Sequence, residues 1–167
     1  MVKPPLRLET YYFTKVAVSA DPCYEPQEEG AAPAITIDTD VGLGQHSDDP
    51  DRWMVTLGVH AKSPDEKPIP YKIDLEVVGF FRVEPDVDKE KAPLLIQANG
   101  AAILYSAARE YLLTITGRGP WPPMLLPTTN FLGLGKATVK GPPRSRRKRK
   151  SALRAKHITN TGAGKVL

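Results

Sequence analysis

The residues whose types could support catalysis or metal binding are scattered carboxylates and three histidines. Five aspartates fall between positions 38 and 51 in a strand-and-turn pattern, and a solvated strand face explains them better than a cation site does. His46, His60 and His157 are far apart along the chain, and Cys23 is its only cysteine, so the sequence lacks the ligand spacing of a zinc site. The sequence therefore predicts no metal, no cofactor and no enzymatic activity.

A glycine-punctuated segment at residues 133–140 has a faint likeness to a phosphate-binding loop. It lacks the GxxxxGK(S/T) spacing, and Ala137 follows Lys136 where that motif needs a hydroxyl. We therefore do not expect nucleotide binding.

A proline-rich loop carries the residues best suited to binding apolar chains. Prolines at positions 120, 122, 123 and 127 exclude regular helix and favour an extended path. Apolar side chains along such a path can form a groove for extended segments, which bind by burial of apolar area and by main-chain pairing with a strand edge. Ordinary core packing is the alternative for each of them. The residues predicted to line this groove are Tyr12, Trp53, Trp121, Met124, Leu125, Leu126 and Phe131.

Basic residues are concentrated at the C-terminal end. Residues 1–141 contain 14 Lys and Arg against 19 Asp and Glu, a net of −5, whereas residues 142–167 contain 9 basic residues and no acidic one. One interpretation is a solvated tail; the other is contact with nucleic acid through counterion release, with anionic lipid or with an acidic partner. No aromatic residue lies among the charges, so nucleic-acid binding would be nonspecific. The predicted contact residues are Arg144, Arg146, Arg147, Lys148, Arg149 and Lys150.

Alternating apolar residues predict four strands. Their expected ranges are residues 6–20, 34–43, 53–61 and 69–83. The segments between them are too short for crossover helices, so we expect an antiparallel meander. In the first strand, strict alternation places Tyr12 on the same face as Leu6 and Leu8. Tyr11 and Phe13 then fall on the opposite, polar face, which leaves apolar side chains on both faces of the sheet.

One long helix follows the strands. Apolar residues recur at the 3.6-residue period, Asn99 is a suitable N-cap and Gly117 is a suitable left-handed C-cap. Strands followed by a helix predict an α+β fold in which the helix covers one face of the sheet. A helix of about 17 residues is about 25 Å long, too short to cover strands of about 50 Å, so the uncovered apolar area predicts oligomerisation. The helix residues assigned to subunit contacts are Ile103, Leu104, Ala107, Tyr111, Leu112 and Ile115.

Composition fits one domain with a tail. The chain has 167 residues, of which 41% are hydrophobic and 25% are charged, and no window approaches the roughly 18 apolar residues of a membrane span. The first ten residues lack the apolar core of a secretory signal. We therefore expect a cytoplasmic protein with a domain over residues 1–132 and a basic, disordered tail over residues 133–167.

The helix and the loop after it resemble a known family. The matching residues, in chain order, are Tyr105, Ala108, Arg109, Glu110, Gly117, Arg118, Gly119, Pro122, Pro123, Leu125 and the PTTNF run at 127–131. This order resembles the SecB export-chaperone family. With the four strands before it, the likeness covers residues 6–132.

The resemblance implies an α+β tetramer, a dimer of dimers in which sheets extend across subunits and the long helices lie between them. SecB-like proteins are ATP-independent holdases without catalytic activity. They keep unfolded preproteins export-competent in apolar grooves and pass them to the SecA motor, whereas toxin–antitoxin-associated relatives protect an antitoxin. The alternative from another class is a nucleic-acid-associated oligomeric scaffold that acts through the basic tail.

The chain departs from the family pattern in two places. Export-type members dock the motor partly through two acidic residues of the first strand, and this chain has Val16 and Ala20 in their place. A third acidic residue of that docking surface lies in the fourth strand, where this chain has Asp74. Family members also follow the Asn-Phe pair with a second helix, where this chain has the glycine-punctuated segment and the basic tail.

Overall fold

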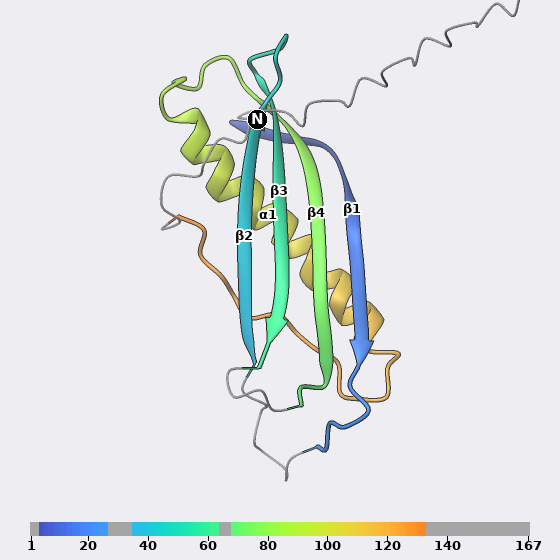
Figure 1. The fold of residues 1–167 in the computed structure, drawn as a ribbon. Coiled ribbons are helices and arrows are strands. Elements are labelled where there is room, and N and C mark those ends of the chain that lie inside the picture. Colours follow the sequence, from blue (N-terminus) through green and yellow to red (C-terminus); the bar gives the residue numbers. More distant parts are fainter. Residues whose placement is uncertain (1–3, 27–34, 64–67, 133–167) are drawn as a thin grey trace, which may run out of the picture.

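Four strands form one layer and a single long helix packs across it. The computed structural model describes residues 4–26, 35–63 and 68–132. Its elements are β1 (Leu6–Ala20), β2 (Thr36–Gln45), β3 (Arg52–Lys62), β4 (Tyr71–Val83) and α1 (Ala92–Thr116). Figure 1 shows α1 running diagonally behind the sheet, on one face of it. The predicted α+β class, with four antiparallel strands followed by a long helix, is confirmed.

The strand order across the sheet is β1-β4-β3-β2, and every neighbouring pair is antiparallel. The predicted meander holds for β2, β3 and β4 but not for β1, which pairs with β4 from Leu6 opposite Val83 to Ala20 opposite Tyr71. A hairpin between β1 and β2 is not imposed by the sequence because 15 residues separate them, many more than a tight turn needs. The arrangement is a Greek key, and it makes β1 and β2 the two edge strands.

Two β-bulges in β1 change which of its side chains face the helix. The register with β4 shifts between Leu8 and Thr10 and again between Phe13 and Lys15. Each shift adds one unpaired residue and reverses the alternation. The strict alternation predicted from the sequence is therefore wrong between the two bulges.

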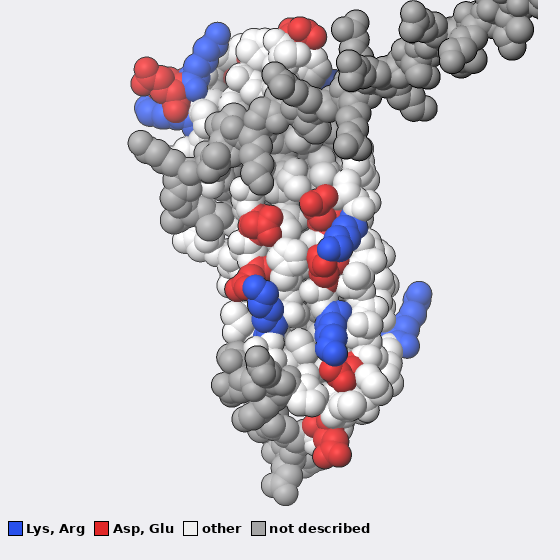
Figure 2. Space-filling model, in the orientation of Figure 1, with Lys and Arg blue, Asp and Glu red and all other residues white. Residues whose placement is uncertain are grey.

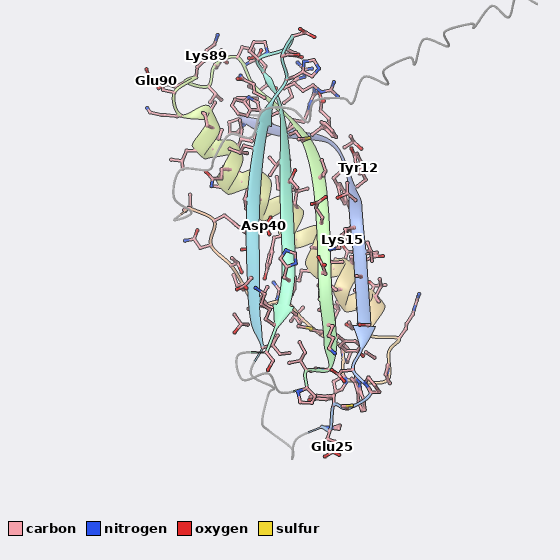
Figure 3. All side chains as sticks on the ribbon, in the orientation of Figure 1. Tyr12, Lys15, Glu25, Asp40, Lys89 and Glu90 are labelled. Carbon is pink, nitrogen blue, oxygen red and sulfur yellow. The ribbon has the colours of Figure 1, made fainter. Side chains whose placement is uncertain are left out.

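The consequence is clearest at two aromatic residues. The ring of Phe13 lies 4.5 Å from that of Tyr111 on α1, so Phe13 faces the helix. Tyr12 lies 6.1 Å from Phe80 instead. Figure 3 shows Tyr12, with Lys15 and Asp40, on the face of the sheet turned away from α1.

The helix is longer than predicted at its N-terminal end. It begins at Ala92 with a proline in its first turn, and Lys91 is its N-cap. Asn99 is therefore an exposed residue inside the helix and not its cap. Gly117 does end the helix, but with φ −64° and not in the predicted left-handed conformation.

The core lies between α1 and the sheet and continues beneath the segment that follows the helix. Its fully buried members come from β3, β4, α1 and that segment, and include Val55, Leu57, Leu75, Val77, Phe81, Ile96, Leu104, Leu112 and Leu126. Two glycines allow α1 to approach the sheet closely. A Cβ at Gly79 would lie 2.7 Å from Leu104, and one at Gly100 would lie 2.9 Å from Val55.

Candidate binding groove

An apolar groove lies between the start of β2 and the segment that follows α1. We call residues 120–132 the proline segment; it crosses behind the sheet to the β2 edge, where it is drawn in orange in Figure 1. The groove has a volume of about 360 Å³, and no charged side chain lines it. Its lining residues are Tyr24, Ile35, Ile37, Pro70, Pro122, Pro123, Met124, Leu125 and Pro127.

The proline segment is an extended chain with alternating sides. Prolines fix the backbone dihedral φ and lack an N–H, so they favour this path and leave apolar surface without hydrogen-bond donors. Leu126 has no exposed surface and belongs to the core, whereas Leu125 beside it is 55% exposed. Met124 is 8% exposed, packs with the core and also lines the groove. The segment therefore presents one apolar side to the groove while its other side is part of the core.

The β4 end of the segment is held by the hydroxyl of Tyr71. This oxygen accepts a hydrogen bond from the Trp121 N–H at 3.1 Å. It lies 2.8 Å from the Trp121 carbonyl and 3.1 Å from the Thr116 carbonyl, the two acceptors open to its proton. A Cβ at Gly119 would overlap the Tyr71 ring, so only glycine allows this close approach.

Two more hydroxyls from α1 hold the segment farther along. The buried Thr116 Oγ1 accepts a hydrogen bond from the Met124 N–H at 2.9 Å and donates one to the Leu112 carbonyl at 2.6 Å. The Tyr105 hydroxyl donates to the Pro127 carbonyl at 2.8 Å. The segment is thus tied to both the sheet and the helix.

The turn after β1 closes one end of the groove. The Asp21 carbonyl accepts a hydrogen bond from the Trp121 indole N–H at 3.1 Å, and Tyr24 packs edge-on against the Trp121 ring at 5.3 Å. The Asp21 carboxylate accepts the Cys23 N–H at 3.0 Å and pairs with Lys72 at 3.1 Å. These two contacts, the Cys23 hydrogen bond first, lower the pKa of Asp21.

The opposite face of the sheet carries ion pairs between strands. His60 lies 3.1 Å from Asp40 and 3.2 Å from Asp74, and Asp74 also pairs with Lys15. The hydrogen bond from Lys15 is the main cause of the lowered pKa of Asp74. Figure 2 shows both signs of charge interspersed over this face. In the described part of the chain, no group of three or more His, Cys, Asp or Glu side chains is arranged to hold a metal ion.

The structure brings together some of the residues predicted to form the groove and separates others. Met124 and Leu125 line it, and Trp121 packs against Tyr24 at its end. Leu126 and Phe131 belong to the proline segment but are buried on its core side, where Phe131 packs against Tyr105.

Two predicted groove residues lie elsewhere. Trp53 is 7% exposed and sits opposite Gln45, about 25 Å along β2 from the groove residue Ile37. Tyr12 is 49% exposed on the opposite face of the sheet, because the first bulge in β1 reverses the alternation of its side chains. Neither residue contributes to this groove.

Several groove residues were not predicted as such. The sequence predicts that the prolines shape the loop and that Ile35 and Ile37 lie in a strand, but no sequence pattern places that strand next to the loop. Tyr24 lies in a segment without hydrophobic periodicity. Only the Greek-key strand order makes β2 an edge beside the proline segment.

The predicted subunit-contact residues of α1 divide into two groups. Leu104 and Leu112 are fully buried in the core of the chain itself. Ala107, Tyr111 and Ile115 are half-buried, and Ile103 is exposed. Surface for a contact with another copy is thus left at four of the six positions. The six basic residues from Arg144 to Lys150, and the rest of the predicted tail, lie outside the described residues.

Comparison with known proteins identifies the family. Residues 2–140 match the family described as preprotein translocase subunit SecB. The match spans most of the chain, so this protein belongs to the SecB family. In the described part of the chain, no helix combines the length and the apolar character that a membrane crossing requires.

Curated relatives agree with this assignment. The chain is 31% identical over 108 residues to the protein-export protein SecB of Bradyrhizobium diazoefficiens, a match that covers 65% of each chain. It is 28% identical over 109 residues to SecB of Nitrobacter hamburgensis, again over 65% of each. An uncharacterized protein of Methanocaldococcus jannaschii is 29% identical over 102 residues. The chain spans about 65% of the length of the first two relatives.

A solved structure has the same fold. The SecB-like chaperone Rv1957 of Mycobacterium tuberculosis, solved with a ChAD peptide from the HigA1 antitoxin, superposes with a TM-score of 0.57. The match covers 75% of this chain and 91% of that one, at 16% identity. The shared fold is confirmed by this likeness.

Proposed function

We propose that this chain is an ATP-independent holdase that binds unfolded client segments in the groove between β2 and the proline segment. The observation that carries the proposal is a groove of about 360 Å³ with apolar walls and no charged lining, set beside an edge strand. A site for unfolded chains needs apolar area more than exact polar contacts. The protein acts in the cytoplasm, needs no cofactor and keeps preproteins competent for export.

Two kinds of contact would hold a client. Apolar client side chains bury area against the proline wall, at about 25 cal/mol per Å². The outer edge of β2 has no partner strand among the described residues, so its backbone groups are open to pairing with an added strand. Ile35 and Ile37 lie two residues apart, which suits a client with apolar residues at every second position.

The assembly we propose is a homotetramer, a dimer of dimers. Its support is the apolar surface of α1 that the single chain leaves uncovered, where Ile103 is 39% exposed and Leu113 is 42% exposed. Burial of these side chains between copies would explain why an otherwise polar helix face carries them. A monomer in solution at micromolar concentration would contradict this part of the proposal.

The proposal has two forms, which differ in whether the client is a preprotein or an antitoxin. Hand-over to the SecA motor is the export form of the proposal, and protection of an antitoxin is the other form. The second form is supported by the solved SecB-like chaperone, whose structure contains an antitoxin peptide. Binding of this chain to purified SecA, measured by titration, separates the two.

The basic tail favours a second function, that of a nucleic-acid-associated scaffold. The 9 basic residues after position 141 without one acid are the observation behind it. Deletion of residues 142–167 would then reduce the salt dependence of DNA binding. An unchanged salt dependence removes the basis for this candidate.

The holdase proposal is tested by suppression of client aggregation with a matched pair of variants. Leu125 in the groove and Leu94 on α1 are 55% and 57% exposed, so both tolerate a charge without loss of core packing. Leu125→Asp should lower the rate at which the protein captures an unfolded client, and Leu94→Asp should not. Equal activity of wild type, Leu125→Asp and Trp121→Ala/Leu125→Ala would contradict the proposed groove.

A further inference from the structure

The proline segment has an unusual backbone. Within the described part of the chain, residues 120–132 form no backbone-to-backbone hydrogen bond; the last such bonds are those of the turn that ends at Gly119. Four of the residues are prolines, which have no N–H to donate. Whatever fixes this wall of the groove must therefore come from side chains and from burial.

Three hydroxyl groups supply most of that fixation. They belong to Tyr71 on β4 and to Thr116 and Tyr105 on α1, which are regular elements packed in the core. Together they engage the main chain of the segment at Trp121, Met124 and Pro127. The groove residues Pro122, Pro123 and Leu125 lie between these points.

The hydrogen bonds at Tyr71 and Thr116 hold the proline segment in one position. The Tyr71 oxygen accepts a hydrogen bond from the Trp121 N–H and lies 2.8 Å from the Trp121 carbonyl, and so fixes the main chain of Trp121 relative to β4. The Thr116 side chain is fully buried, and its hydroxyl both accepts from the segment and donates to its own helix. A buried N–H that loses such a partner carries its full desolvation cost, so the bound position is strongly preferred.

We propose that the hydroxyls of Tyr71, Thr116 and Tyr105 are positioning groups that hold the proline wall at the distance from β2 at which clients bind. This inference rests on the proposed function of the groove. Without the hydroxyls, the wall samples other positions, and the groove is formed for only part of the time. The apparent affinity for a client is then reduced in proportion to the fraction of molecules in which the groove is formed. They set affinity without touching the client.

The main test measures the affinity of the full chain for a fluorescent, unfolded apolar peptide. Tyr71→Phe and Thr116→Val each remove one hydroxyl and keep the side-chain shape. We expect each to weaken binding roughly three- to tenfold, the effect of losing one hydrogen bond. Thr116→Ser keeps the hydroxyl and should stay within about twofold of wild type. Tyr11→Phe removes an exposed phenol in the middle of β1, the edge strand opposite β2, and should change nothing.

A second readout follows the wall itself. Hydrogen exchange of the Trp121 and Met124 amides, which donate to the two hydroxyls, should accelerate in Tyr71→Phe and Thr116→Val respectively. All measurements are made where circular dichroism shows every variant folded. Wild-type peptide affinity in both variants, or an equal loss in Thr116→Ser and Thr116→Val, would overturn the inference.

The two readouts separate this inference from the proposed function. If wild type does not bind the peptide while the two amides exchange faster in the variants, the holdase proposal fails and the hydroxyls still hold the segment. If wild type binds and the amides of both variants keep their protection, the positioning role fails and the groove stands.

Discussion

The two faces of the sheet differ in what stabilises them. On the α1 face, Leu57, Leu75 and Phe81 have no exposed surface. On the opposite face, the pair of Lys62 and Asp38 leaves 67% and 47% of the two side chains exposed. The first face is stabilised by burial, the second by weak, screened ion pairs. The groove lies where the first face continues past α1, so that apolar area remains beyond the cover of the helix.

The largest expected effect comes from the buried face. Phe81 is fully buried and lies next to Gly79 on β4 and to Gly100 on α1, where the helix crosses the sheet. Phe81→Ala should lower the free energy of unfolding by about 3–5 kcal/mol, through lost burial and an unfilled cavity. Urea denaturation measures this. A loss below about 1 kcal/mol would mean that the two faces do not differ as described.

A smaller loss of stability is expected when a methyl group is added at the close contact between helix and sheet. A Cβ at Gly79 would lie 2.7 Å from Leu104 and 2.9 Å from Phe81, too close for either to remain in place. Gly79→Ala should therefore cost about 1–3 kcal/mol by overpacking. The same denaturation experiment checks this, with Gly42→Ala as the control, because its Cβ would meet Thr56 at an ordinary 3.6 Å.

The Asp21 turn should make stability depend on pH. The pKa of Asp21 is lowered in the folded protein, by the Cys23 hydrogen bond first and then by Lys72. A carboxyl whose folded pKa is lowered stabilises the fold above its ordinary pKa of 3.8 and loses that contribution as the pH falls through the folded value. Asp21→Asn should flatten the acid limb of the stability curve below about pH 4. An unchanged acid limb, or one equally flattened by Asp86→Asn, would contradict this role.

The smallest effect is expected on the charged face. The exposed side chains of Lys62 and Asp38 are 2.7 Å apart, and their attraction is screened by water and salt. Lys62→Ala should therefore leave the thermal midpoint unchanged at physiological salt. A clear drop in the thermal midpoint that disappears at 1 M salt would contradict this expectation, because it would show that the ion pairs of this face stabilise the fold measurably.

Hydrophobic periodicity was enough to predict the class of fold. The four strands, the helix and the apolar character of the proline segment all follow from residue patterns, because burial dominates the energy of each element. Which side chains of β1 face the helix could not be predicted in the same way, since a bulge leaves no signature in the alternation that it interrupts. The start of α1 was missed because Asn99 resembles a cap, although the apolar residues before it continue the helix to Ala92.

The candidate site was predictable only in part. Met124 and Leu125 were identified because the groove wall is a continuous segment of chain. Its other wall comes from β2, and that contact depends on β1 pairing with β4, a long-range choice without a local signal. Trp53 and Tyr12 are also predicted groove residues, yet one belongs to the core and the other to the opposite face.

In the proposed function, clients bind on the groove side of the sheet. Photo-crosslinking tests it most directly, with benzoylphenylalanine placed at Leu125 or at Tyr12, positions that are 55% and 49% exposed in the native chain. With an unfolded client present, we expect crosslinks from position 125 and only background from position 12. Equal crosslinking at both, or a preference for position 12, would contradict it.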